Sequence, residues 1–129
     1  MLYACAPAPL QMGAAMGLMH LDPEFYDNIS KEYQKKRDRI CDALNTAGLT
    51  PFVPQGAYYV LCDISGIPGS SGEKRVMHLL KELKVASVPG EVFYHDTAGE
   101  NLTRFCFAKE DTVLDEACRR LKSYGRKNP

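Results

Sequence analysis

The sequence has 129 residues, of which 45% are hydrophobic, and this is enough for one domain with a modest core. Its 16 basic and 16 acidic residues cancel, which excludes a charge-driven binder of nucleic acid or of an anionic membrane surface. No apolar stretch approaches the ~20 residues that a transmembrane helix needs, so we expect no membrane segment.

The first predicted element is a helix at residues 10–19, which is rich in methionine, alanine and glycine. It carries no charge before Asp22 and so has no obvious solvent-facing side. We therefore expect it to pack against a surface outside this sequence. A longer helix is predicted to follow. Asp22 can cap it, Pro23 suits its first turn, and Gly48 can adopt the left-handed conformation that ends it.

Two strands and a helix are predicted next. Proline marks an edge strand at residues 49–53, and the run at 57–62 is apolar on both faces, as in a strand that is covered on both sides. Ser70 and Glu73 have the spacing of a capping box. An apolar stripe follows them, which predicts a helix that ends at about Lys84.

The last part of the chain is predicted to hold two more strands and a final helix. The strands occupy residues 85–88 and 101–108, and a turn precedes the second. Glu110 and Asp111 open the helix, because acidic side chains favour the positive end of the helix dipole. We expect a polar tail at residues 125–129.

Arg104 is the candidate binding residue of the strand at 101–108. Alternation places it on one face, with Phe105 and Phe107 on the other face, where they would anchor the strand. A guanidinium held on such a rigid element fits a carboxylate or a phosphate through paired hydrogen bonds. The preceding segment, 89–96, is too apolar for an ordinary loop and is predicted to line a cleft or contact a partner. Taken alone, a strand arginine more often reaches water or pairs with a nearby acid.

These elements predict an α+β fold. A small, largely antiparallel sheet carries helices on one face, and an N-terminal helix and a long connecting helix precede it. The five cysteines are widely spaced within apolar segments, which indicates reduced core thiols of a cytoplasmic protein. His78 has no partner at metal-ligand spacing, so we predict no metal site. Without a phosphate loop or a nucleophile elbow, the motifs alone make no complete active site.

Several motifs in one order and spacing resemble the carboxy-terminal portion of a class I/II aminotransferase of fold type I. They are Pro54-Gln55-Gly56-Ala57-Tyr58-Tyr59-Val60, Asp63-Ile64-Ser65, Val88-Pro89-Gly90-Glu91-Val92-Phe93-Tyr94, and Arg104-Phe105-Cys106-Phe107-Ala108-Lys109-Glu110. Residues 5–11 resemble the segment that leads towards the small domain in kynurenine- and methionine-type aminotransferases. The resemblance covers nearly the whole chain. It implies a remnant of the large domain or interface helix at 1–21 and a small domain at 22–129.

The resemblance also implies a site. Arg104 would bind the α-carboxylate of the substrate, and Pro89, Gly90 and Phe93 would border its side chain. The parent enzyme would use pyridoxal phosphate as an electron sink, act on amino acids and 2-oxo acids, contain a large domain and form a homodimer. The Schiff-base lysine, the aspartate facing the pyridine nitrogen and the phosphate-binding arginine would all lie upstream of Met1. We therefore expect neither bound cofactor nor activity from this chain alone.

Two alternatives stay open. One is a pyridoxal phosphate-dependent lyase of the same fold, because the small domain hardly distinguishes transamination from elimination. The other is a regulatory module that binds an amino acid through Arg104 and performs no chemistry. A change in the resembling motif, where Ala57 follows Gly56 in place of a frequent second glycine, is expected to be tolerated.

Overall fold

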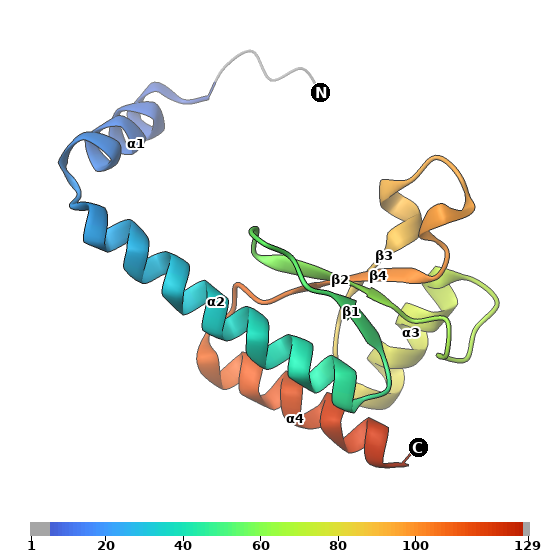
Figure 1. The fold of residues 1–129 in the computed structure, drawn as a ribbon. Coiled ribbons are helices and arrows are strands. Elements are labelled where there is room, and N and C mark those ends of the chain that lie inside the picture. The colour runs from blue at the N-terminus through green and yellow to red at the C-terminus, as the bar shows by residue number, and fades with distance from the viewer. Residues whose placement is uncertain (1–5, 128–129) are drawn as a thin grey trace. The chain divides into compact units, whose positions relative to one another are not determined.

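The computed structural model describes residues 6–127 (Figure 1), and the chain divides into two units, residues 1–32 and 33–129. Helix α2 runs through the boundary between them. In chain order the elements are α1 (Ala8–His20), α2 (Pro23–Thr46), β1 (Thr50–Phe52), β2 (Tyr59–Asp63), α3 (Gly72–Leu83), β3 (Val88–Pro89), the 3-10 turns η1 (Gly90–Phe93) and η2 (Thr97–Gly99), β4 (Leu102–Cys106) and α4 (Asp111–Lys127).

The first unit contains α1 and the beginning of α2. No residue of α1 is buried, and its Leu18 and Met19 are each 74% exposed. One contact inside the unit joins the two helices, because the Tyr26 hydroxyl donates a hydrogen bond to the Gly17 carbonyl at 3.0 Å. The predicted helix is therefore present, and its apolar surface is uncovered within the unit. Among residues 6–127, no helix is both long and apolar enough to cross a membrane.

The second unit is built on a four-stranded sheet with the order β1-β2-β4-β3, in which every neighbouring pair is antiparallel. Helices cover one face of this sheet (Figure 1). Four residues of the two central strands on that face, Val60, Cys62, Thr103 and Phe105, are at most 3% exposed. The prediction of a small antiparallel sheet with helices on one face is confirmed.

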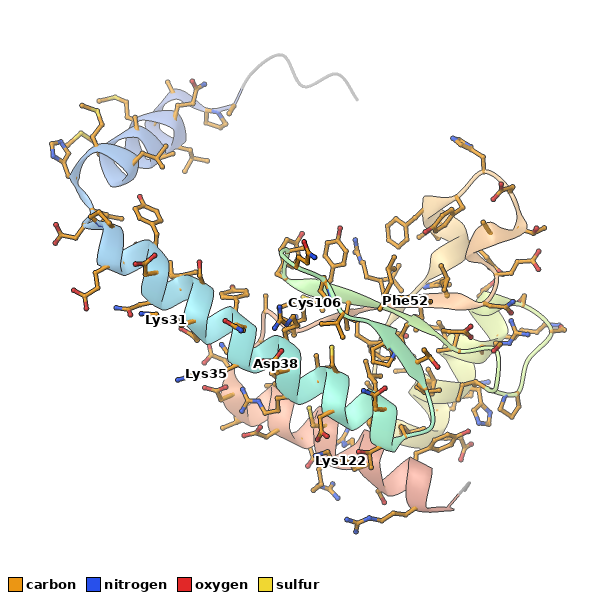
Figure 2. All side chains as sticks on the ribbon, in the orientation of Figure 1. Lys31, Lys35, Asp38, Phe52, Cys106 and Lys122 are labelled. Atoms are coloured by element: carbon orange, nitrogen blue, oxygen red, sulfur yellow. The ribbon has the colours of Figure 1, made fainter. Side chains whose placement is uncertain are left out.

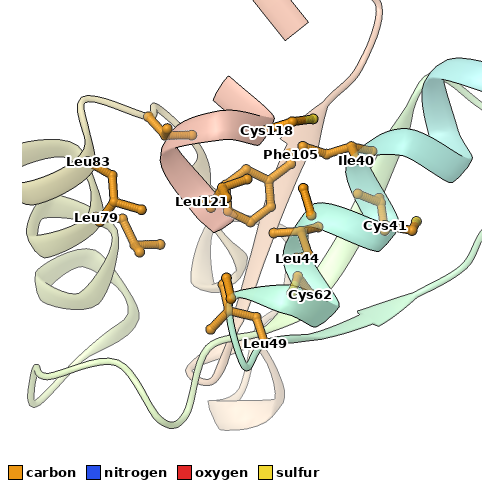
Figure 3. Close-up of a cluster of buried hydrophobic side chains, with 14 of the residues drawn as sticks. Ile40, Cys41, Leu44, Leu49, Cys62, Leu79, Leu83, Phe105, Cys118 and Leu121 are labelled. Carbon is orange, nitrogen blue, oxygen red and sulfur yellow. The ribbon is translucent and has the colours of Figure 1, made fainter. Parts of the chain in front are cut away.

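The core lies between the sheet and its helices (Figure 3). Leu44 of α2, Leu79 of α3 and Leu121 of α4 are each completely buried there, so each helix contributes one apolar stripe. Cys62 is also buried, and desolvation raises the pKa of its thiol to about 12, so this thiol is unreactive at neutral pH.

The cysteine prediction holds for most of the described thiols. Cys41, Cys62 and Cys118 are free and buried, and burial raises the pKa of each. The prediction of a core thiol is wrong for Cys106, which is free but exposed at the end of β4, on the face that the helices leave open. Cys5 lies outside the described residues.

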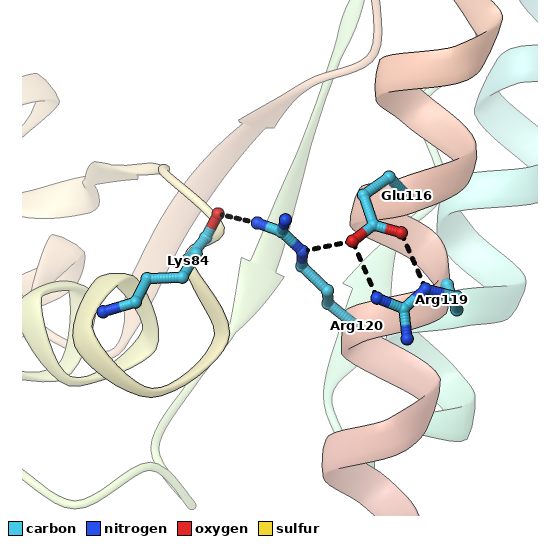
Figure 4. Close-up of polar contacts among 4 residues, drawn as sticks. All are labelled: Lys84, Glu116, Arg119 and Arg120. Carbon is cyan, nitrogen blue, oxygen red and sulfur yellow. Dashed lines mark hydrogen bonds and ion pairs between the residues drawn. The ribbon is translucent and has the colours of Figure 1, made fainter.

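Polar contacts join α4 to the two other helices. The Arg39 guanidinium of α2 pairs with Asp111 and, at 2.7 Å, with Asp115. On the other side, Arg120 donates to the Lys84 carbonyl at 2.9 Å, and Glu116 accepts hydrogen bonds from Arg119 and Arg120 (Figure 4). These two arginines, Arg119 first, lower the pKa of the Glu116 carboxyl to about 2. Because the pairs are largely exposed, we expect each to stabilise the fold only slightly.

Three predicted details are wrong. The N-cap of α3 is Ser71, whose hydroxyl accepts from the Lys74 amide at 3.3 Å, and not Ser70. The third strand is Val88–Pro89, shorter and later than the predicted 85–88.

The third detail is the carboxy-terminal tail, because α4 continues through Gly125 to Lys127. A Cβ atom at Gly125 would lie 2.0 Å from the carbonyl oxygen of Thr46, at the end of α2. The glycine therefore permits the ends of α2 and α4 to touch.

Candidate functional site

Arg104 lies in the middle of β4, on the face of the sheet that the helices leave open. It pairs with Leu61 of β2 on one side and with Val88 of β3 on the other, so backbone ladders hold it from both directions. Its neighbours Thr103 and Phe105 point into the core and are at most 3% exposed. The predicted alternation is confirmed, and the guanidinium is carried by a rigid element.

Two aromatic rings flank the Arg104 guanidinium. Its Cζ atom lies 5.0 Å from the ring centroid of Tyr59 and 4.5 Å from that of Phe93. Both distances are within the range of cation–π attraction. We call Tyr59, Arg104 and Phe93 the aromatic sandwich.

The hydrogen-bonding capacity of Arg104 is unused within the part of the chain that the structure describes. No side chain or carbonyl among residues 6–127 accepts a hydrogen bond from its guanidinium, and none forms an ion pair with it. Three other arginines of the unit, Arg39, Arg75 and Arg120, do have such partners. A partly buried guanidinium with five donors and no acceptor suits an external anion.

The three predicted loop residues lie close to Arg104. Pro89 is paired with Thr103, and the Thr103 hydroxyl donates to the Val88 carbonyl at 2.9 Å. Gly90 is buried, and a Cβ atom there would lie 2.5 Å from the Gly99 carbonyl oxygen, so only glycine fits. Phe93 ends the turn and reaches the guanidinium. The structure thus brings the predicted site residues together.

Tyr59 is the residue of the sandwich that the sequence did not indicate as a site residue. It sits on the same face as Arg104 because Leu61, two residues further along β2, is the direct partner of Arg104. The register of β2 against β4 would have been needed to find it. Just before it, Ala57 has a left-handed backbone with φ of 64°, in the position where the resembling motif has glycine. A left-handed residue with a Cβ atom costs about 1–2 kcal/mol.

The surroundings of the aromatic sandwich are apolar and exposed. Phe52 of β1, Tyr58, Val92 and Tyr94 are between 40% and 63% exposed. Figure 2 labels Phe52 and Cys106, which both belong to the open face. A single cation among apolar side chains can recognise a small anion that carries an apolar group.

The described residues supply neither a metal site nor lysines beside the sandwich. Residues 6–127 contain no group of three His, Cys, Asp or Glu side chains that could hold a metal ion. Strands β2 and β4 and the turn η1 contain no lysine. We therefore assign Arg104 to a carboxylate or phosphate, and assign no residue of this chain to a bound cofactor.

Comparison with known proteins identifies the family of the chain. Residues 1–121 match the family described as aminotransferase class I and II. The chain belongs to this family. It is 35% identical over 133 residues to kynurenine–oxoglutarate transaminase 3 of Mus musculus, covering 89% of this chain and 29% of that protein. It is 32% identical over 114 residues to methionine aminotransferase of Escherichia coli (strain K12), covering 88% and 29%.

Solved structures resemble the fold over the same extent. A methionine aminotransferase from Escherichia coli superimposes with a TM-score of 0.76 at 34% identity, covering 89% of this chain and 30% of that one. An alanine aminotransferase from Pyrococcus furiosus gives a TM-score of 0.79 at 27% identity, covering 95% and 31%. The chain thus spans about 30% of the length of these aminotransferases.

Proposed function

We propose that residues 22–129 are the C-terminal small domain of an aminotransferase that moves an amino group from an amino acid to a 2-oxo acid. Residues 1–21 would be the remnant of an interface helix of the large domain. The family membership and the coverage of about 30% of each relative support this assignment. The full-length protein would be a cytoplasmic homodimer, like the parent that the motifs imply.

The single observation that carries the role of the site is the unpaired guanidinium of Arg104 between two rings. The ring centroids of Tyr59 and Phe93 lie within 5.0 Å of its Cζ atom, so the N–H groups at its edge are the route by which an anion would reach it. A carboxylate in that plane can accept two parallel hydrogen bonds. In the closed site of a full-length enzyme, Arg104 would fix the α-carboxylate of the substrate and so its orientation.

The turn after β3 would border the substrate side chain. Phe93 is 47% exposed, and it presents its ring both to Arg104 and to the open face of the sheet. Pro89 and Gly90 hold the start of this turn against β4 and η2. We therefore assign Pro89, Gly90 and Phe93 to the wall beside the substrate.

The residues around Arg104 do not by themselves fit pyridoxal phosphate. That cofactor needs a lysine and a phosphate site, whereas the described strands and turn of the site offer one guanidinium and no lysine. We assign the cofactor to the rest of the full-length protein, where it would supply the electron sink. This chain alone is then expected to be inactive and to contribute only substrate recognition.

Two other functions use the same geometry. A lyase of the same fold would bind the α-carboxylate through Arg104 and eliminate a group from the substrate. A regulatory module would need only the free guanidinium and its apolar surroundings. Names of the relatives favour amino-group transfer, since those reported above are all aminotransferases or transaminases.

Product analysis of the full-length protein separates these three functions. It would be incubated with an amino acid that carries an ¹⁵N-labelled amino group and with a 2-oxo acid of different chain length. The proposed function predicts that the label appears in the amino acid derived from the added oxo acid. Label released as ammonia indicates a lyase. Binding of the amino acid with no product indicates a regulatory module, and either of these results contradicts the proposal.

A further inference from the structure

The turn that carries Phe93 is tied to a helix terminus through Glu91. The Glu91 Oε1 atom accepts a hydrogen bond from the backbone N–H of Gly72 at 2.7 Å. Gly72 is the first residue of α3, and its N–H has no partner within the helix. A carboxylate at this end also interacts favourably with the helix dipole. Glu91 therefore joins η1 to α3 across 19 positions of sequence.

The other attachments of this segment hold its far end. Arg75 of α3 donates to the Glu100 carbonyl at 3.0 Å and to the Asn101 side chain at 2.9 Å. Gly90 and Gly99 touch through their backbones. Between these points, Glu91 supplies the side-chain hydrogen bond that connects the turn to α3 in the part of the chain that the structure describes.

The ring of Phe93 is only partly covered by its surroundings. Its neighbours Val92 and Tyr94 are 63% and 40% exposed, and Phe93 itself is 47% exposed. The Tyr94 amide bonds back to the Glu91 carbonyl at 3.5 Å, so the turn is closed on Glu91 and moves with it. The position of the partly exposed Phe93 ring therefore depends on where the backbone of the turn is held.

We propose that Glu91 is a positioning residue for the aromatic sandwich. By docking on the N-terminus of α3, it holds the turn so that the Phe93 ring lies against the Arg104 guanidinium. Loss of this hydrogen bond frees the turn and moves the Phe93 ring away from the guanidinium. The guanidinium can then rotate out of its carboxylate-binding orientation. The effect on carboxylate binding rests on the proposed function, whereas the effect of Glu91 on the position of Phe93 does not.

The test is an NMR measurement on the ¹⁵N-labelled 129-residue chain, without substrate or cofactor. The Arg104 Nε–Hε resonance is assigned by its absence in Arg104→Lys. The change in its chemical shift in Phe93→Leu measures the ring-current effect of Phe93 and serves as the reference for the other variants. We expect Glu91→Ala and Glu91→Asp to shift this resonance in the direction of Phe93→Leu, since alanine has no acceptor and aspartate is one methylene too short. Glu91→Gln keeps an acceptor of the same length and should leave the resonance near its wild-type position.

A matched variant tests the other end of the contact. In Gly72→Ala the new methyl would lie 3.0 Å from the Glu100 carbonyl oxygen and 3.1 Å from Glu91 Oε1. The side-chain carboxylate can yield more easily than the backbone carbonyl, so we expect it to be displaced and to give a smaller shift in the same direction. This variant decides the question if Glu91→Ala and Glu91→Asp do not fold. The combination of Glu91→Ala with Phe93→Leu should shift the resonance no further than Phe93→Leu alone.

An unchanged Arg104 resonance in the folded Glu91 variants, or in Gly72→Ala, would overturn the proposal and leave Glu91 as a cap of α3 only. A simple loss of global stability does not produce the expected result, because it lowers the folded fraction without moving a native resonance. Since no substrate is used, the outcome is independent of the product analysis above. The positioning role and the aminotransferase function can therefore fail separately.

Discussion

Removal of either ring of the aromatic sandwich should weaken the recognition of carboxylate substrates by the full-length protein. In Tyr59→Leu and Phe93→Leu the side chain stays apolar, but the ring that faces the guanidinium is lost. A cation–π contact is worth about 0.5–1 kcal/mol at an exposed site and about 2 kcal/mol when it is desolvated. Arg104 is partly buried, so we expect about 1 kcal/mol for each ring, which is roughly a fivefold loss of kcat/KM.

The double variant should lose roughly thirtyfold or more, because the guanidinium then has no wall on either side. Steady-state kcat/KM with an amino acid substrate measures these losses. Tyr94→Leu is the control, since it removes an exposed aromatic side chain one residue beyond the turn and outside the sandwich. If both single variants and the double variant stay within twofold of wild type, the rings do not support the clamp and this reasoning is refuted.

Three further predictions concern the chain itself. Mixed with pyridoxal phosphate, it should form at most nonspecific lysine adducts that are lost on desalting, and a stoichiometric cofactor that survives dialysis would contradict the assignment of the cofactor to the rest of the protein. Deletion of the residues before Asp22 removes the uncovered apolar surface of α1, so sedimentation analysis should show a folded, more monomeric protein. Loss of cooperative unfolding in this variant would show instead that α1 belongs to the core. Ala57→Gly should raise the free energy of unfolding, measured by urea titration, by about 0.5–1 kcal/mol, because the backbone strain relieved in the folded state outweighs the conformational entropy gained by the unfolded state. A less stable variant would disprove this.

The sequence was most informative where local periodicity decides the outcome. Alternation along residues 101–108 placed Arg104 opposite Phe105 and Phe107, and the structure confirms that the two aromatics are buried. The helix that ends at about Lys84 is also confirmed, since Lys84 adopts the left-handed C-cap conformation. Its start was displaced by one residue because Ser70 and Ser71 are adjacent and both can cap. Only the backbone geometry of the folded chain selects Ser71.

Contacts between segments that are distant in sequence could not be predicted from local sequence patterns. Tyr59 joined the site through the register of β2 against β4, and Glu91 reached Gly72 through the packing of η1 on α3. The segment from Gly125 was predicted to be a polar tail, yet α4 continues through it, and Gly125 lies too close to Thr46 for a side chain to fit. In each case the deciding neighbour is far away in sequence, so no periodicity could have indicated it.

The change of Ala57 shows a limit of a different kind. The resembling motif has a glycine at this position, and the substitution was expected to be tolerated. In the structure Ala57 has a left-handed backbone, a conformation that is unfavourable for a residue with a Cβ atom. Knowledge of φ was required to see that position 57 needs a left-handed backbone.

The central claim is that Arg104 recognises the α-carboxylate, and its most direct test is a selectivity ratio. For the full-length protein, kcat/KM would be measured with an amino acid and with the matching amine that lacks the carboxylate, in wild type, Arg104→Lys and Arg104→Ala. Loss of a paired contact in a closed site costs about 2–5 kcal/mol, against about 0–1 kcal/mol for a surface ion pair. Lysine keeps the charge and loses the planar fork.

We therefore predict that Arg104→Lys lowers kcat/KM for the amino acid by at least about thirtyfold, while the value for the amine changes little. The ratio of the two values should fall by the same factor, and it should fall at least as far in Arg104→Ala. If both variants are folded and keep kcat/KM for the amino acid within a few fold of wild type, Arg104 is a structural strand residue and the claim is wrong.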